Sequence, residues 1–393
     1  MRIVPQLTAI CCAAFVFAML QPAFAQDGKK DAAKKKPSAK AKNSKKEDNG
    51  EHLRIIGRPV LVTKSGAELK TRKGVVWRAY LGEVFTVAEV KDDWYWIREK
   101  GGWLWKEQTI PLDLAVEHYS REITAKETAE AYHQRGIAYA AIQDYKNAIA
   151  DYTKTIEMKP QYAGAYVNRG NAHRELKDAK KAMADYSAAI TLDPKNFVAL
   201  NNRGLIHTEN RKFDNALADY NKALSLQKDY AEAFNNRGVV WREKGDYKKA
   251  IQDYTTAIKI YPKYWVAFGN RGFAAKKLGL YDKALADYSQ AALLKPFEPK
   301  ALNDFAWVLA TCPDDKFRNG KSALKDAVKA CELTKQADWN CLDTLGAAHA
   351  EIGDFDKAIR AAEKALKLAP KASKDAVRSR IELYADSKPY RET

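Results

Sequence analysis

A pattern of 34 residues repeats five times within this chain of 393 residues. Each copy contains an Arg-Gly dipeptide, and an Asp-Tyr dipeptide begins sixteen residues after its arginine. A fixed period of this length is typical of stacked helix pairs, each of which buries its apolar face against the next. Such arrays have a large surface for holding other proteins, so the pattern favours a binding scaffold over an enzyme. The arginines are Arg135, Arg169, Arg203, Arg237 and Arg271, and the aspartates are Asp151, Asp185, Asp219, Asp253 and Asp287.

Small residues extend this pattern to seven units, which begin at residues 129, 163, 197, 231, 265, 299 and 339. The sixth unit has 40 residues, lacks the Arg-Gly pair and carries an insertion at 312–320. The seventh unit lacks the Asp-Tyr pair. Prolines, which cannot continue a helix, stand at the ends of five units. They are Pro160, Pro194, Pro262, Pro296 and Pro370.

The arrangement of Arg-Gly, Asp-Tyr, small residues and closing prolines resembles the tetratricopeptide repeat family. The resemblance implies a mainly α fold, an α-solenoid of seven units at 127–370. A half-repeat linking helix is expected at 113–126, and a capping helix and tail at 371–393. Gly136 and its equivalents fall on first helices, where a side chain would block close helix packing. The Arg and Asp of one unit occur together, so we predict that Arg169 pairs with Asp185, and likewise in the other four units.

In that family the first helix of each unit lines a concave groove. The resemblance therefore places a row of amide side chains in the groove, where they could hold an extended peptide or only join neighbouring helices. A clamp for terminal carboxylates needs a lysine where this chain has His133, Val167, Asn201, Asn235 and Gly269, so that mode is rejected. The candidate groove residues are Gln134, Asn168, Asn171, Arg174, Asn201, Asn202, Asn235, Asn236, Arg242, Asn270, Lys276 and Lys277.

Residues 54–112 have a different character. Short β-type runs at 60–63, 84–87, 94–97 and 103–105 are separated by turn residues, which predicts a small barrel of four or five strands. The order of these runs resembles bacterial SH3-like domains. Exposed indoles would suit stacking on sugars or packing on peptides, and the alternative is packing against the half-repeat helix. The candidate aromatic surface is Trp77, Trp94, Trp96, Trp103 and Trp105.

The N-terminus is expected to lie outside the fold. Residues 1–25 have a positive start, an apolar run and Ala23-Phe24-Ala25, which predicts a cleaved export signal. Residues 26–53 carry nine lysines against five acidic residues and almost no large apolar side chain, so they are predicted to be a disordered Lys-rich linker. We expect an exported protein, periplasmic or secreted, with no transmembrane segment after signal cleavage.

The net charge of +17 would attract anionic surfaces such as peptidoglycan or another envelope component. Export removes the chain from most nucleic acid, so we expect no nucleic-acid partner. Three cysteines lie outside the signal, and the spacing of Cys331 and Cys341 fits two helix ends that meet in a hairpin. The alternatives there are a 331–341 disulfide and free thiols.

No arrangement of catalytic side chains is recognisable, and we expect no metal and no cofactor. His173, His207 and His349 share one position in three units, too far apart for two of them to share a metal ion. The sequence thus favours a non-enzymatic scaffold that binds an extended protein segment in its groove. The alternatives are an accessory subunit of an envelope enzyme or secretion complex and, more remotely, a cell-wall hydrolase. The sequence does not indicate an oligomeric state.

Overall fold

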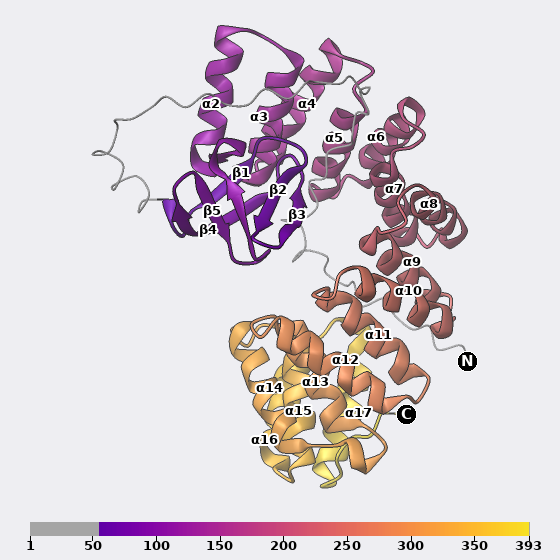
Figure 1. Ribbon diagram of the computed structural model, residues 1–393. Helices are drawn as coiled ribbons and strands as arrows, with labels where there is room; N and C mark the ends of the chain where they lie inside the picture. The colour runs from indigo at the N-terminus through magenta and orange to yellow at the C-terminus, as the bar shows by residue number, and fades with distance from the viewer. Residues whose placement is uncertain (1–54, 393) are drawn as a thin grey trace. The chain divides into compact units, whose positions relative to one another are not determined.

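The computed structural model describes residues 55–392, so the predicted signal and Lys-rich linker lie outside the described residues. The chain divides into two compact units, each of which contains several of the repeats, and their described parts are residues 55–226 and 227–392 (Figure 1). The first unit holds a β-sheet followed by helices, and the second is helical. Among the described residues, no helix is both long and apolar enough to cross a bilayer.

The first unit opens with a small antiparallel sheet in the order β3-β2-β6-β5-β4-β1-β7. Side chains that alternate along the strands, such as Val60, Val62, Phe85 and Ile97, bury one face in a common core. The strands are β1 (Pro59–Val62), β2 (Ala67–Thr71), β3 (Gly74–Ala79), β4 (Val84–Lys91), β5 (Trp94–Ile97), β6 (Gly102–Trp105) and β7 (Thr109–Pro111).

The seven strands exceed the four or five that the sequence predicted, and the four apolar runs correspond only to β1, β4, β5 and β6. Strands β2, β3 and β7 have no buried run of apolar side chains. The valines of β3, Val75 and Val76, are 44% and 45% exposed. Strand β7 has three residues and ends in Pro111. An SH3-like identity for this sheet remains a prediction.

Helix α2 (Leu112–Ala125) connects the sheet to the repeats. Its Ala115 and Tyr119 share a buried cluster with Leu61 and Leu81 from the sheet region and with Ile137 from the first repeat. This shared core makes α2 the half-repeat helix expected from the sequence. The repeat helices that follow are α3 (Ala129–Ala141), α4 (Tyr145–Met158), α5 (Ala163–Glu175), α6 (Ala179–Leu192), α7 (Phe197–Glu209) and α8 (Phe213–Leu226).

The second unit continues the same alternation of first and second helices. Its sixth repeat has the predicted insertion, because α13 ends at Thr311, a short 3-10 helix η4 (Asp315–Phe317) follows, and α14 begins only at Gly320. The helices are α9 (Ala231–Glu243), α10 (Tyr247–Ile260), α11 (Trp265–Lys277), α12 (Tyr281–Leu294), α13 (Pro299–Thr311), α14 (Gly320–Leu333), α15 (Trp339–Glu351), α16 (Phe355–Leu368) and α17 (Lys374–Ala385).

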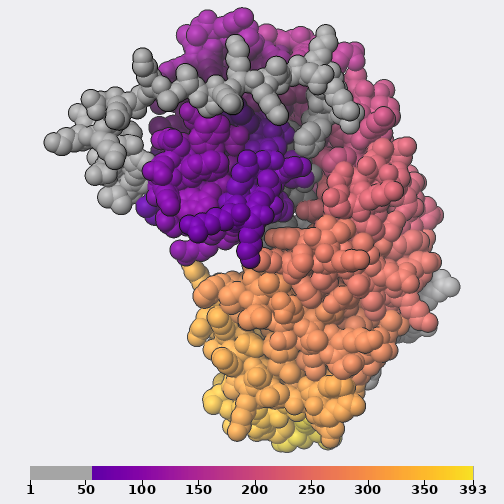
Figure 2. Space-filling model, in the orientation of Figure 1, coloured from indigo at the N-terminus to yellow at the C-terminus, as the bar shows by residue number. Residues whose placement is uncertain are grey.

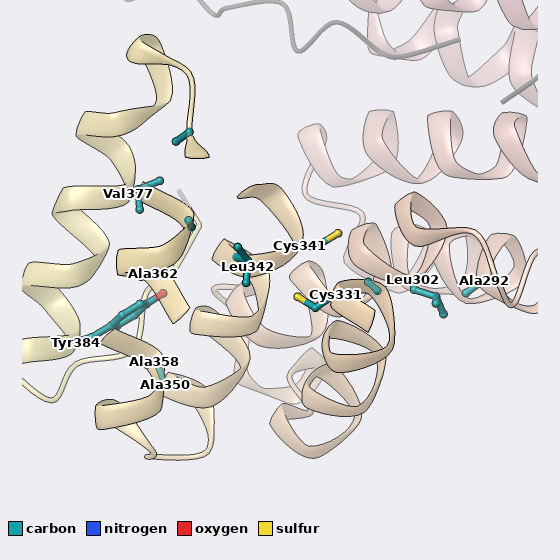
Figure 3. Packing of buried hydrophobic residues seen from close by; sticks show 13 residues of the cluster. Ala292, Leu302, Cys331, Cys341, Leu342, Ala350, Ala358, Ala362, Val377 and Tyr384 are labelled. Atoms are coloured by element: carbon teal, nitrogen blue, oxygen red, sulfur yellow. The ribbon is translucent and has the colours of Figure 1, made fainter. Parts of the chain in front are cut away.

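Helix α17 caps the array, as the sequence predicted. Its Val377 and Tyr384 are buried with Leu342 of α15 and Ala362 of α16 (Figure 3). In the space-filling view, the orange and yellow part of the chain presents a continuous surface on the visible face (Figure 2). An end helix of this kind covers an apolar face that would otherwise be exposed to water.

Candidate functional site

The recurring arginine and aspartate form an ion pair inside each of the first five repeats, which confirms the predicted pairing. Arg169 donates to Asp185 from Nε at 3.0 Å and from Nη2 at 2.8 Å, and the other four pairs have the same two-pronged geometry. The aspartates are buried and the arginines partly so. These pairs join the two helices of one repeat, so they are structural and are not available to a ligand.

The glycine and tyrosine of the repeat form a second contact between the same two helices. A Cβ atom added at Gly136, Gly170, Gly204 or Gly238 would lie 2.7–2.8 Å from the ring of the tyrosine sixteen residues later. Glycine is therefore needed to let the second helix approach, as the sequence predicted. In the seventh repeat, which lacks the Asp-Tyr pair, the equivalent neighbour of Gly346 is the methyl group of Ala362, at 3.5 Å.

Within each unit, first helices of neighbouring repeats also contact one another, and the surface that they form there is called the first-helix face of that unit below. It comprises α3, α5 and α7 in the first unit and α9, α11, α13 and α15 in the second. The candidate groove residues lie on these helices. Polar side chains at the same positions of successive repeats are therefore brought together by the stacking.

In the first unit the amide row is buried and bonded to itself. Asn168 Nδ2 lies 3.0 Å from His133 Nε2, and Asn202 Nδ2 donates to Asn171 Oδ1 at 2.9 Å. Asn201 donates to Asn202 at 3.1 Å. The first two of these contacts join neighbouring first helices, which is the alternative to peptide binding that the sequence left open. Within this row of amides, the buried atoms Gln134 Oε1, Asn168 Oδ1 and Asn171 Nδ2 have no hydrogen-bond partner among the described residues.

His133 is the buried histidine of this row. Because the Asn168 amide nitrogen can only donate, Nε2 of His133 accepts, and its proton is on Nδ1, 3.1 Å from the hydroxyl of Tyr162. Burial lowers the pKa of His133 to about 4. His133 is therefore neutral at pH 7 and acts as a link between α3 and α5.

The second unit repeats the amide contacts and adds cations. Asn270 donates to Asn235 at 2.9 Å, and Asn235 donates to Asn236 at 3.4 Å. Arg242 lies 3.5 Å from Asn270 and pairs with Glu243 at 2.8 Å. In the first unit, Arg174 lies 3.5 Å from Glu175. The amides and both arginines thus have partners within the protein, and Lys277 of α11 is the exposed cation among the candidate residues.

Three of these cations surround one aromatic ring. The charged groups of Arg242, Lys276 and Lys277 lie 5.4, 5.7 and 6.0 Å from the centroid of Phe273. Lys276 and Lys277 also line a cavity of about 130 Å³ together with Cys312 and Glu392. Cationic groups around an aromatic ring and a cavity form a surface suited to acidic or aromatic side chains.

The sequence did not indicate one part of this site. Glu392, seven residues beyond the end of α17, lies against Lys276 of α11, and its carboxylate accepts from the indole of Trp307 on α13. Glu392 lies outside the seven repeats, and 115 residues separate it from Lys276. Only the fold brings these residues together.

Four of the five candidate tryptophans form two cross-strand pairs on the β5–β6 hairpin. Trp94 stacks on Trp105 with ring centroids 6.4 Å apart, and Trp96 lies 5.3 Å from Trp103. Ile97 and Leu104 of the same strands point into the core. Trp94, Trp96 and Trp103 are partly exposed and Trp105 is 39% exposed, so this side of the hairpin is an aromatic surface. We call it the indole face.

Trp77, the fifth candidate, has a different environment. Its indole Nε1 donates to Glu83 at 3.3 Å, and Lys100 Nζ lies 3.4 Å from its ring centroid. Lys100 also pairs with Glu83 at 3.5 Å. Burial raises the pKa of Glu83 against the opposing effect of Lys100. Trp77 belongs to this polar cluster and to the edge of the sheet core.

The three described cysteines are free, buried thiols, so of the two alternatives left open for Cys331 and Cys341 the structure has the free thiols. Both residues lie in one apolar cluster (Figure 3), and burial raises the pKa of each thiol to about 12. They pack as small apolar side chains. Within residues 55–392, no group of three or more His, Cys, Asp or Glu side chains could hold a metal ion.

Comparison with known proteins identifies the helical part. Models described as tetratricopeptide repeat match residues 133–197, 197–230, 231–264, 267–298 and 339–372, about half of the chain. The chain belongs to the tetratricopeptide repeat family. No curated protein matches it.

Several solved structures are similar to parts of this chain. A chain of the APC/C hetero-tetramer Cut9–Hcn1 is 19% identical with a TM-score of 0.53, over 59% of this chain and 45% of that one. This chain thus spans less than half of that relative. PilF from Pseudomonas aeruginosa is 19% identical with a TM-score of 0.47, over 53% and 92% of the two chains. YrrB, described as a TPR protein with an unusual peptide-binding site, is 22% identical with a TM-score of 0.39, over 48% and 97%.

Proposed function

We propose that this tetratricopeptide repeat protein is a non-enzymatic scaffold that binds an extended segment of another protein on its first-helix face. The observation that carries the proposal is the cationic group of Arg242, Lys276 and Lys277 around Phe273 on that face. Acidic and aromatic side chains of a partner would find charge and stacking partners there. The paired amides nearby would hold the helices in register.

Peptide selection followed by cross-linking tests this binding mode. Twelve-residue peptides are selected from a random library, and a photo-reactive amino acid is placed at Lys277 on α11 or at Lys259 on the second helix α10. Both lysines are exposed, so they are matched in type and accessibility. Selected peptides should cross-link from position 277 and not from 259, and their binding should weaken with salt. Equal cross-linking from both positions, or no selected peptide, would contradict the proposal.

We further propose that the protein is exported and that the indole face contacts the cell wall or a partner protein. The support is the export signal predicted from the sequence and the two partly exposed tryptophan pairs, whose flat rings suit sugar faces and apolar side chains. The basic linker would add salt-sensitive attraction to an anionic surface.

Purified cell-wall sacculi provide the test of this contact. Residues 26–393 are incubated with sacculi at low and high salt, beside the variant Trp94→Ala/Trp105→Ala. Binding that survives high salt and is lost in the variant supports wall recognition by the indole face. Salt-resistant binding that is unchanged in the variant rules that face out. Absence of salt-resistant binding favours a protein partner for it.

A further inference from the structure

The last described residues of the chain lie on the first-helix face of the second unit. After α17 ends, residues Lys388–Glu392, called the tail below, have no helix or strand of their own. Their contacts reach α15, α13 and α11, the first helices of three successive repeats. An extended segment of this protein therefore already occupies the kind of surface that the proposed function assigns to a partner.

Glu392 makes the densest set of these contacts. Both carboxylate oxygens lie 2.8 Å from Lys276 Nζ, and Oε2 accepts from Trp307 Nε1 at 2.9 Å. Its backbone N–H donates to the carbonyl of Thr311 at 2.9 Å. Thr311 is the last residue of α13, where carbonyl groups have no partner within the helix. The backbone of the tail thus supplies a hydrogen-bond donor to a carbonyl group at the end of α13.

The two preceding residues contact neighbouring repeats. Arg391 pairs with Glu351 at the end of α15 at 2.6 Å, and it reaches the carbonyl of Ala310 at 3.4 Å. The Tyr390 ring lies 5.8 Å from the ring of Trp307. Tyr390, Arg391 and Glu392 therefore meet an aromatic subsite on α13, an acidic subsite on α15 and a basic subsite on α11, respectively.

We propose that the tail is an intramolecular ligand of the first-helix face and that a partner segment carrying aromatic, basic and acidic side chains in this order displaces it. The inference rests on the proposed function, because it names the chemistry of the partner at that same face. A tethered ligand has an effective concentration in the millimolar range. A partner must therefore exceed the affinity of the tail, which makes the site selective for strong ligands.

Cys312 reports on displacement of the tail in the full-length protein. It is a free thiol, only 2% exposed, and it lines the same cavity as Lys276 and Glu392. Departure of the tail would open this cavity to a thiol reagent. Cys331 and Cys341 are buried in a different cluster and serve as internal controls in the same molecule.

The first experiment measures the alkylation rate of each cysteine by mass spectrometry in wild type, Glu392→Gln and Lys276→Met. Loss of the charge-assisted contacts should raise the Cys312 rate roughly tenfold while Cys331 and Cys341 stay slow. Glu382→Gln, at an exposed position of α17, is the matched control and should behave as wild type. Unchanged Cys312 rates in both test variants would overturn the proposal, as would equal acceleration of all three cysteines in both.

The second experiment uses a fluorescent peptide with the sequence of residues 385–393. It should bind a protein that ends at Ser387 at least roughly tenfold more tightly than the full chain, because the tail competes only in the latter. A peptide with Gln in place of Glu392 should bind more weakly. Equal binding to both proteins, or none, would overturn the proposal.

Selected library peptides that still cross-link from position 277 would then leave the proposed function standing. If the Cys312 rates show that the tail is released in the variants but no library peptide binds, the proposed function fails instead.

Discussion

At the scale of single residues, the 34-residue pattern is a description of contacts inside one repeat. The arginine bonds the aspartate and the glycine admits the tyrosine, each pair joining a first helix to its own second helix. The seventh repeat shows an apolar solution to the same problem. It has Leu345 and Ala361 at the positions of the ion pair, and it packs without the two charges.

This comparison predicts the result of breaking one pair. Asp185→Ala leaves the Arg169 guanidinium without its acceptor and should lower the free energy of unfolding by about 2–3 kcal/mol. Arg169→Leu/Asp185→Ala copies the seventh repeat and should regain most of that loss. Urea denaturation of the two variants and wild type provides the measurement. An unchanged unfolding midpoint in Asp185→Ala would show that the pair contributes nothing.

The buried His133 predicts acid sensitivity. Its pKa in the folded state is about 4, below its ordinary value of 6.5, so the unfolded state takes up the proton first as the pH falls. Stability from this group is complete above about pH 6.5 and is lost between there and about pH 4, by roughly 3 kcal/mol. His133→Asn should flatten this part of the pH profile, measured by denaturation at each pH. The control His118→Asn alters an exposed histidine and should leave the profile as in wild type.

At the scale of elements, the link between sheet and repeats depends on a close approach at Gly82. The residue has φ +81°, and a Cβ atom there would lie 2.5 Å from Ile137 Cγ2 on α3. Gly66 has a similar φ of +75° but open space around it. The two positions therefore separate backbone strain from steric overlap.

The expected outcome is a larger loss at Gly82. Gly66→Ala should cost about 1–2 kcal/mol from the left-handed backbone alone. Gly82→Ala should cost about 1–3 kcal/mol more, because the added methyl group forces Ile137 to move. Thermal or urea unfolding of both variants decides the point. Equal losses of stability in the two variants would mean that Ile137 moves aside without a measurable change in the free energy of unfolding.

At the scale of the whole molecule, a repeat array derives its stability from contacts between neighbouring elements. Damage at one place should therefore stay local. Leu104 in β6 and Leu342 in α15 are both fully buried leucines, in clusters that share no residue. Truncation of either removes about 2–5 kcal/mol of local packing.

Hydrogen exchange with mass spectrometry measures the spread of that damage. Leu104→Ala should speed exchange in β1–β6 and leave α14–α16 as in wild type, and Leu342→Ala should do the reverse. The reason is that each segment opens through its own neighbours before the whole chain unfolds. Faster exchange throughout the chain in either variant would show instead that the molecule unfolds as one cooperative unit.

Much of the fold could be predicted from the sequence, because the contacts that define a repeat join residues sixteen apart and recur five times. That recurrence made the helices, the Arg169–Asp185 type of pair and the longer sixth repeat recognisable. The strands β2 and β3 were harder, since their exposed valines and polar residues carry no buried run. For Cys331 and Cys341 the sequence left a disulfide and free thiols as alternatives, because residue spacing alone does not fix the sulfur-to-sulfur geometry that a disulfide needs.

The candidate site, too, could be predicted only in part from the sequence. The positions of Asn168, Asn202 and Asn270 on first helices followed from the period, but their partners did not. An amide can bond a peptide or a neighbouring helix equally well, and only the packed structure shows that these amides bond to neighbouring helices. The contact of Glu392 with Lys276 and Trp307 has no periodic signal at all. The sequence determined the repeated local geometry, and the tertiary structure decided the contacts between distant segments, because those depend on where the completed array places its surfaces.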